Sequence, residues 1–517
     1  MALLVLSALV FAPHILHGGF YLDDWGDAAG FRYPPGGQTF GNELSYFWEG
    51  FHYRPILVLY TPLKYFVFGT HMGWIIAWTV ALGVLVAVLL YGVLRTLSVP
   101  WYHAWVIAAL TIVYPWFDSI RLWGSANPPP VSIALALAGL WVALCALRGH
   151  TWRVHLIASA FYLVSILAYE ITLPLIAVFG GLYVLRAGWR TGRVRWAMDL
   201  VVVVIGAVWD KTQTTRAVSG VSAALAHLKE IVTHGGEIAA RTVQPLGANP
   251  RTGLALAVLA IVFAAGLVAW RWAPERADRS PGWGLREWLL LAGAGLLVAA
   301  LGWVIFIPAD PYYTPTIFGE TNRVNALAGL GLVIAAYAAL GIVGTLVARL
   351  FKRGAWALPV TLVLACLLGG AYVHVLARHI GLWDDAFRIE TAAGERMQRQ
   401  LPNLPPGSTV FTSNYPAYLT LGVPIYAVTW DLNGMIKLRY HDGTLAGYPL
   451  IEGEELVCDR GGVVLRGAEG TVAESPYGLA HFLNLGTGHH TAPNGRRECA
   501  AVVGSYAPGP LFLSTAY

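Results

Sequence analysis

Apolar segments long enough to cross a lipid bilayer recur along the sequence, and they restrict the possible folds more than any other feature. A membrane-spanning helix needs roughly 20 consecutive, mostly apolar residues. Runs of this kind occur at 1–18, 72–94, 101–118, 129–147, 154–170, 171–186, 196–209, 252–270, 288–307, 324–348 and 356–376. Of the 517 residues, 56% are hydrophobic and only 12% are charged, which excludes an ordinary soluble protein. We therefore predict an α-helical polytopic membrane protein with about 11 transmembrane helices.

The first apolar segment, MALLVLSALVFAPHILHG, has two possible interpretations. A secretory signal peptide has a positively charged start and an A-x-A cleavage site, and this segment shows neither. We therefore interpret residues 1–18 as the first transmembrane helix.

The basic residues between the apolar runs indicate the orientation of the chain. They collect in alternate short loops, which hold Arg95, Arg148, Arg153, Arg186, Arg190, Arg193, Arg195, Arg271, Arg276, Arg279, Arg286, Arg349, Lys352 and Arg353. Loops rich in Lys and Arg stay in the cytoplasm. The pattern predicts a multi-pass protein of the cytoplasmic membrane with its N-terminus inside and its C-terminal part outside. The net charge of +5 is spread over many loops, so we expect no nucleic-acid partner.

Three segments on the predicted outer side are too long to be simple turns: 19–71, 210–251 and the chain after about residue 380. The first contains an apolar stretch at 54–69 that is interrupted by Pro62 and Lys64. The second has apolar residues at helical spacing over 218–233. Both stretches suit helices that lie in the membrane interface. We assign residues 1–380 to a transmembrane domain that carries the outer loops 19–71 and 210–251.

The polar segment 381–517 is predicted to be a small extracytoplasmic domain. Prolines and glycines punctuate it, and its short runs rich in β-forming residues indicate a β-rich or α/β fold. Two of the four cysteines, Cys458 and Cys499, fall in this domain, whereas Cys145 and Cys366 lie in predicted spans. Because the predicted outer side is oxidising, we expect Cys458 and Cys499 to form a disulfide.

The sequence HGGFYLDDWGD at 17–27 places carboxylates directly after the first span. Gly18 and Gly19 suit the end of a helix, and anions beyond a helix C-terminus oppose its dipole. Asp23 and Asp24 can mark the water boundary of the span, act as a general base, or hold a divalent cation together. Their adjacency and their aromatic neighbours favour a functional role.

Further charges fall at the predicted outer ends of spans. Each one alone is typical of an interface anchor, but acidic and basic groups gathered on one membrane face indicate a site. A carboxylate base with cations suits a reaction in which a hydroxyl attacks a sugar carbon and a phosphate departs. The residues concerned are Arg54, which follows His52, and Glu170, Asp210, Lys211 and Arg323, the last of which follows Asn322.

The residues around Asp23 resemble a motif of a known superfamily. Tyr21-Leu-Asp-Asp-Trp25 follows the first span, Tyr53-Arg-Pro55 begins the first interfacial stretch, and Gly69-Thr-His71 precedes the second span. This pattern is similar to that of the GT-C superfamily of membrane glycosyltransferases, by motif over residues 1–120 and by topology over 1–376. The resemblance implies a GT-C-like fold and a sugar donor linked to polyprenyl phosphate. The sequence has no P-loop and no Gly-rich dinucleotide motif, which agrees with a lipid-linked donor.

The resemblance also implies roles for single residues. Asp23 or Asp24 is expected to act as the catalytic base or as a metal ligand, so Mg²⁺, Mn²⁺ or Ca²⁺ is a candidate cofactor at this pair. Arg323, Lys211 and Arg54 are expected to bind the donor phosphate. The expected substrate-binding residues are Glu170, His52, Trp25 and Asn322.

Two other classes of function are compatible with the sequence. A lipid-linked glycan polymerase or ligase would use the same kind of site with a lipid-pyrophosphate donor. A flippase or transporter typically has related halves and ionisable residues near the bilayer midplane, whereas no repeat is evident here and the charges lie at the outer ends of spans. The acceptor can be a glycan, a lipid or a protein, and the sequence does not specify the sugar.

Overall fold

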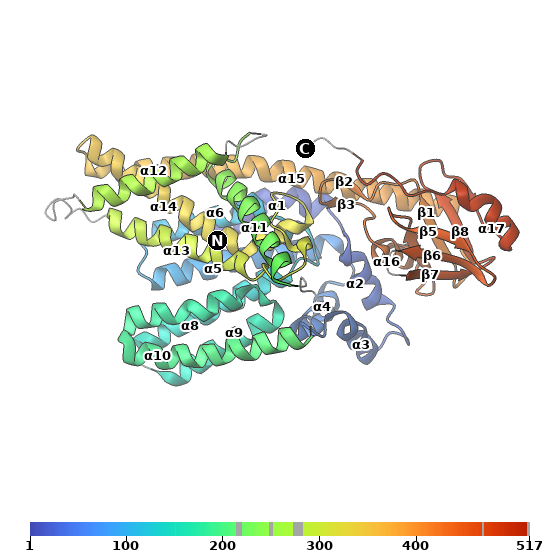
Figure 1. Ribbon diagram of the computed structural model, residues 1–517, viewed down its shortest axis with the longest axis horizontal. Coiled ribbons are helices and arrows are strands. Elements are labelled where there is room, and N and C mark those ends of the chain that lie inside the picture. Colours follow the sequence, from blue (N-terminus) through green and yellow to red (C-terminus); the bar gives the residue numbers. More distant parts are fainter. Residues whose placement is uncertain (150, 214–219, 248–251, 272–282, 468–469, 514–517) are drawn as a thin grey trace. The chain divides into compact units, whose positions relative to one another are not determined.

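The computed structural model describes the chain except for residue 150 and residues 214–219, 248–251, 272–282, 468–469 and 514–517 (Figure 1). The chain divides into two compact units. The helical unit comprises Met1–Ala12, Thr79–Arg121 and Ala126–His379. The mixed unit comprises Pro13–Trp78, Leu122–Ser125 and Ile380–Tyr517. The predicted boundary near residue 380 therefore recurs, but the mixed unit also includes the first predicted outer loop and four residues that follow Arg121.

Apolar helices dominate the helical unit and confirm the predicted fold class. Seven helices in the described part of the chain are long and apolar enough to cross a membrane, and four shorter apolar helices accompany them. The helices wholly or partly in this unit are α1 (Ala2–His17), α5 (Met72–Thr96), α6 (Trp101–Val113), α7 (Ser119–Leu122), α8 (Pro128–Arg148), α9 (Trp152–Ala168), α10 (Leu173–Gln213), α11 (Val221–Val243), α12 (Thr252–Arg271), α13 (Leu285–Val304), α14 (Ala326–Leu350) and α15 (Ala357–Gln400). Short 3-10 helices lie at Pro115–Phe117, Glu170–Thr172, Pro311–Tyr313, Glu320–Asn325 and Gly354–Trp356.

Three predicted spans have different ends in the structure. The span predicted at 101–118 ends at Val113 because Pro115 disfavours a helical conformation at Tyr114. The spans predicted at 171–186 and 196–209 form the two arms of α10. The chain reverses direction between them at Gly188, whose φ of 77° is a conformation that glycine adopts without strain. Trp196 Nε1 donates to the Ala177 carbonyl at 2.8 Å and joins the two arms.

Helix α14 lies at the centre of the helical unit, with 89% of its most apolar stretch buried. It packs against α13 through small residues. A Cβ on Gly295 would lie 2.7 Å from the Ala335 nitrogen, and a Cβ on Gly331 would lie 2.4 Å from the Ala299 nitrogen. Glycines at these positions let the two backbones approach closely, as in other membrane helix pairs.

The mixed unit contains α2 (Asp23–Arg32), α3 (Phe40–Phe51) and α4 (Pro55–Phe68) from the first predicted outer loop. Helix α4 coincides with the apolar stretch predicted at 54–69. Helix α15 continues to Gln400, so the polar composition after residue 380 does not end the helix. In the helical unit, α11 begins at Val221 and extends ten residues beyond the predicted stretch 218–233, whose first two residues lie outside the described part.

The remainder of the mixed unit is an α/β domain with three sheets (Figure 1). The strand order of the largest is β4-β1-β8-β9, in which β1 pairs in parallel with β4 and β8 while β9 is antiparallel. A small core around Phe411, Val463 and Phe482 fills its interior. Its elements are β1 (Thr409–Ser413), β2 (Tyr418–Thr420), β3 (Val423–Pro424), α16 (Thr429–Tyr440), β4 (Ala446–Pro449), β5 (Glu455–Cys458), β6 (Gly462–Gly467), β7 (Gly470–Pro476), β8 (Ala480–Asn484), β9 (His490–Thr491), α17 (Arg496–Val502) and a 3-10 turn at Val503–Ser505.

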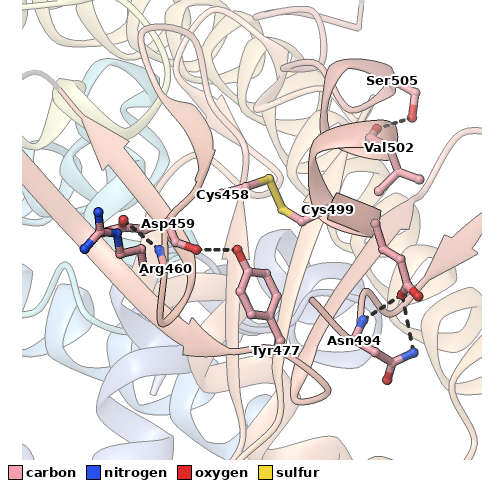
Figure 2. Close-up of a disulfide and its surroundings, with 9 residues drawn as sticks. Cys458, Asp459, Arg460, Tyr477, Asn494, Cys499, Val502 and Ser505 are labelled. Atoms are coloured by element: carbon pink, nitrogen blue, oxygen red, sulfur yellow. Dashed lines mark hydrogen bonds between the residues drawn. A yellow bond between two sulfur atoms is a disulfide. The ribbon is translucent and has the colours of Figure 1, made fainter. Parts of the chain in front are cut away.

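A disulfide joins Cys458 at the end of β5 to Cys499 in α17, as predicted (Figure 2). Close to it, Tyr477 donates its hydroxyl to the Asp459 carbonyl at 2.5 Å. The Cys499 side chain is fully buried in the core of the α/β domain. The disulfide therefore fixes the last helix of the chain to the three-stranded sheet.

Candidate functional site

The carboxylates of the opening motif begin a helix. Helix α1 ends at His17, and α2 starts at Asp23 after Leu22, whose φ is 46°. Asp23 and Asp24 thus occupy the first turn of α2, where the helix dipole stabilises negative charge. The sequence predicts these anions just beyond the C-terminus of a helix, where the helix dipole disfavours them. Helix α2, which the sequence does not predict, places them at a helix N-terminus, where the dipole favours them.

Asp24 is fully buried, and groups of the protein surround its carboxylate. Oδ2 accepts hydrogen bonds from the backbone nitrogens of Tyr21 at 3.2 Å and Gly124 at 3.1 Å. Oδ1 accepts a bond of 2.7 Å from the Ser125 hydroxyl. Asp24 therefore holds the segment Leu122–Ser125 against the start of α2. In this structure the Asp24 carboxylate is thus enclosed by groups of the protein, and its predicted role as a base stays a prediction.

Asp27 and Lys64 complete this buried cluster. The Ser125 hydroxyl also lies 3.0 Å from Asp27 Oδ2. Lys64 of α4 is 4% exposed, and its Nζ donates to the Gly124 carbonyl at 3.2 Å. Burial raises the pKa of Asp24 to about 6 and that of Asp27 to about 7, although the nearby Lys64 charge opposes both shifts. Two carboxyls thus titrate close to neutral pH next to one buried cation.

Asp23 differs from Asp24 because it is only half-buried. Its Oδ1 accepts a hydrogen bond of 2.7 Å from the indole nitrogen of Trp430 in α16. Trp430 is 49% exposed and lines a groove of about 650 Å³ between α2 and α16. Asp23 is therefore the more exposed carboxylate of the predicted pair.

The donors around the aspartates do not suit a metal site. Asp24 directs its oxygens at two N–H groups and a hydroxyl, whereas a metal ligand needs its lone pairs directed at the ion. Within the described ranges, no group of three or more His, Cys, Asp and Glu side chains could hold a metal ion. The residues present do not fit the divalent cation considered for Asp23 and Asp24.

The other predicted residues of the mixed unit lie on the same helices or beside them. Trp25 is buried, and its Nε1 donates to Glu390 Oε1 at 2.5 Å, so its ring packs inside the unit. His52 and Arg54 precede α4. The guanidinium of Arg54 lies 5.0 Å from the centre of the Tyr53 ring.

The remaining predicted residues belong to the helical unit. Arg323 donates to the Tyr312 hydroxyl at 3.0 Å and lies over its ring. Glu170 occupies the turn before α10, and exposed Lys211 lies in the last turn of that helix.

Asn322, which was predicted to contact substrate, is fully buried. Its side chain accepts from the Ser119 hydroxyl at 2.5 Å and donates to Asp118 at 2.6 Å. Asp118 in turn contacts His379 Nδ1 at 2.5 Å. Asn322 therefore connects buried polar groups of the helical unit.

Sequence reasoning missed four participants in the cluster: Asp27, Lys64, Gly124 and Ser125. Asp27 stands in the opening motif, three residues after Asp24 and so on the same face of a helix. Lys64 interrupts an apolar helix, and a cation in such a position often has a buried anionic partner. No local pattern identifies Gly124 and Ser125, because they follow Asp24 by 100 and 101 positions.

Comparisons with known proteins give similarity in structure alone. Neither a family model nor a curated protein matches the sequence. The oligosaccharyltransferase of Archaeoglobus fulgidus is similar over 80% of this chain and 61% of its own, with 16% identity and a TM-score of 0.37. ArnT of Cupriavidus metallidurans bound to undecaprenyl phosphate is similar over 82% of this chain and 84% of its own, with 14% identity and a TM-score of 0.37.

A further structure of the archaeal enzyme contains an inhibitory peptide and a dolichol-phosphate, and this chain spans 64% of its length with a TM-score of 0.38. The chain thus covers somewhat over six tenths of the oligosaccharyltransferase. These matches say nothing about activity or substrate.

Proposed function

We propose that the protein is an integral-membrane glycosyltransferase that moves a sugar from a polyprenyl-phosphate-linked donor to an acceptor hydroxyl on the outer face of the membrane. The observation that carries the proposal is the half-buried carboxylate of Asp23, which accepts a hydrogen bond from Trp430, a residue that lines a groove of about 650 Å³. The helices of membrane-spanning length and the resemblance of the segment 21–25 to the GT-C motif support the same function.

In this proposal Asp23 is the general base. Its carboxylate takes the proton of the acceptor hydroxyl while the hydroxyl oxygen attacks the anomeric carbon of the donor sugar. The bond between that carbon and the phosphate oxygen breaks, and its electron pair leaves with the polyprenyl phosphate. Asp24, Asp27 and Lys64 have a positioning role, because they fix the segment 122–125 to α2 and so hold the helix that carries Asp23.

The donor phosphate needs a cation, and Arg323 is our first candidate. A guanidinium offers two parallel N–H groups to phosphate oxygens, which an ammonium cannot do. The contact with the Tyr312 ring restricts the Arg323 side chain to one region, which lowers the entropy lost on binding. Lys211 and Arg54 remain proposals for the same task, and His52 and Glu170 remain proposals for substrate contact.

The test uses the full-length protein in lipid nanodiscs with a panel of undecaprenyl-phosphate-linked pentoses and hexoses that carry a radioactive sugar. Release and transfer of the label are measured. Replacement of the base should lower transfer roughly 100-fold or more, so Asp23→Asn should be nearly inactive while Asp23→Glu keeps part of the activity.

Asp459→Asn is a matched control, because Asp459 is an exposed carboxylate that accepts a hydrogen bond from the Arg460 backbone nitrogen and does not line this groove. If Asp23→Asn retains wild-type transfer, the assignment of the base is wrong. If the wild-type protein moves intact lipid-linked sugars across the membrane without breaking the sugar–phosphate bond, the protein is a flippase. If it accepts only lipid-pyrophosphate donors, it is a polymerase or ligase.

A further inference from the structure

We propose that the groove between α2 and α16 is an acceptor site for an anionic carbohydrate, with a neutral sugar ring at Trp430 and the acidic group at Lys437 and Arg32. This inference rests on the proposed glycosyl transfer and adds the chemical class of its acceptor.

The two helices that form the groove run in the same direction. Near their start, Asp23 contacts Trp430. Further along, a Cβ on Gly434 would lie 2.2 Å from the Trp25 carbonyl oxygen, so the helices touch there. Beyond their ends, Gly443 lies against Tyr33, with 2.7 Å between a Cβ at Gly443 and the Tyr33 Cβ. The start, middle and end of α2 therefore lie beside the start, middle and end of α16, and the groove follows both helices.

The cations of this groove lie at one of its ends. At the other end, the lining residue Trp430 donates its indole N–H to the Asp23 carboxylate. Arg32 is in the last turn of α2, and Lys437 is in the last turns of α16, and both line the groove. Because Lys437 follows Trp430 by seven residues, it lies on the same helix face about 10 Å farther along the axis. That distance suits a ligand of about two sugar rings with its negative group remote from the reacting hydroxyl.

The walls of the groove suit a carbohydrate. Trp430, Tyr33 and Tyr46 supply rings on which the C–H faces of a sugar can pack. Gly26 and Gly30 form part of the wall on α2. A Cβ at Gly26 would lie 3.4 Å from the Trp430 ring, and one at Gly30 would lie 1.9 Å from the Tyr46 ring, so Gly30 lets Tyr46 pack closely on α2.

Lys437 supplies an independent argument for an anionic group. Lys437 lines the groove and is half-buried, and this burial lowers the pKa of its ammonium group. A cation held in this way is stabilised by an anion that enters the groove. A uronate and a sugar phosphate both supply such an anion, so the shared chemistry is a negatively charged group on a sugar.

Binding is measured by isothermal titration calorimetry on the full-length protein in nanodiscs, in the absence of donor. The probes are cellobiose, the disaccharide of glucuronic acid and glucose, and a cellobiose phosphate. We expect each anionic disaccharide, or one of the two, to bind roughly ten-fold more tightly than cellobiose, as for a charge-assisted contact. Comparison of the two anionic probes distinguishes a uronate site from a phosphate site.

Three variants locate the site. Lys437→Gln should remove the preference for the anionic probe and leave cellobiose binding unchanged, whereas Lys437→Arg should retain the preference. Lys229→Gln, which changes an exposed lysine of α11, should bind as the wild type does.

Equal affinity for charged and neutral disaccharides overturns the proposal, and so does a preference that survives Lys437→Gln. Competition by undecaprenyl phosphate for the same site also overturns it, because the groove would then hold the donor. Binding is measured without turnover. The result therefore tests the anionic acceptor site even if the protein proves not to be a glycosyltransferase.

Discussion

The indole nitrogen of Trp430 donates a hydrogen bond of 2.7 Å to the Asp23 carboxylate, across 407 positions of sequence. This bond joins the first turn of α2 to the first turn of α16. The orientation of the proposed base therefore depends on a residue of the α/β domain.

Trp430→Phe should separate this orienting role from the packing of the ring. The substitution keeps an aromatic side chain and removes the N–H donor, so we expect kcat for sugar transfer to fall roughly ten-fold, since small errors in the position of a base are costly. Donor binding should stay at its wild-type level, as measured by equilibrium binding of radioactive donor. An unchanged kcat would show that the hydrogen bond does not position Asp23.

The buried carboxyls should make stability depend on pH between about 4 and 7. Burial raises the pKa of Asp24 from 3.8 to about 6 and that of Asp27 from 3.8 to about 7. The folded state therefore binds these protons more tightly than the unfolded chain, so the contribution to stability is complete below pH 3.8 and is lost as the pH rises through 6 and 7. We expect a higher thermal midpoint at pH 5 than at pH 8.

Asp27→Asn should flatten this pH profile and raise the midpoint at pH 8, because an amide keeps a neutral group next to Ser125. The exposed pair Asp385 and Arg388 provides a control, since Asp385→Asn should leave the profile unchanged. A steeper profile in Asp27→Asn would contradict the assigned burial.

Removal of the buried cation should weaken the same cluster. Lys64→Met leaves two buried carboxyls without their nearby positive charge, a change that costs about 3 kcal/mol or more in buried ion pairs. We expect a fall of several degrees in the thermal midpoint that is larger at pH 8 than at pH 5. The double variant Lys64→Met/Asp27→Asn should recover part of the loss. A loss of equal size at both pH values would show that Lys64 acts through packing alone.

The helices of this protein were largely predictable because an apolar run of membrane-spanning length has few alternatives to a helix. The predicted end of a helix was wrong where a single residue stops it, as Pro115 does for the span predicted at 101–118. The cluster around Asp24 could not be predicted, since Gly124 and Ser125 reach it from 100 positions away and their own sequence has no motif. The disulfide was predictable for a simpler reason, because only Cys458 and Cys499 lie in the predicted outer domain.

Loss of the disulfide should destabilise the α/β domain. The bond closes a loop with a sequence separation of 41, for which the chain-entropy treatment gives about 4 kcal/mol. We expect the variant Cys458→Ser/Cys499→Ser to become sensitive to limited proteolysis within 381–517 at a lower temperature than the wild type. Cys366→Ser, which removes an exposed free cysteine, should have no such effect. Equal protease resistance of the double variant would contradict a stabilising role.

Arg323→Lys should weaken the donor interaction if its guanidinium holds the phosphate. A lysine keeps the charge but loses the paired N–H groups, so we expect KM for the donor to rise roughly ten-fold with little change in kcat. Arg388→Lys, at an exposed position, should leave both constants unchanged. A fall in kcat with an unchanged KM would exclude a simple role in donor binding.

The Ser125 hydroxyl has one hydrogen and two carboxylate neighbours, at 2.7 Å from Asp24 and 3.0 Å from Asp27. It can donate to only one of them at a time, so the other oxygen is satisfied only when one carboxyl carries a proton of its own. One proton shared between the two acids leaves a single negative charge, which the ammonium of Lys64 neutralises. The buried site is thus electroneutral when half protonated, and infrared spectroscopy near neutral pH should detect a carbonyl stretch of a protonated acid that Asp27→Asn removes.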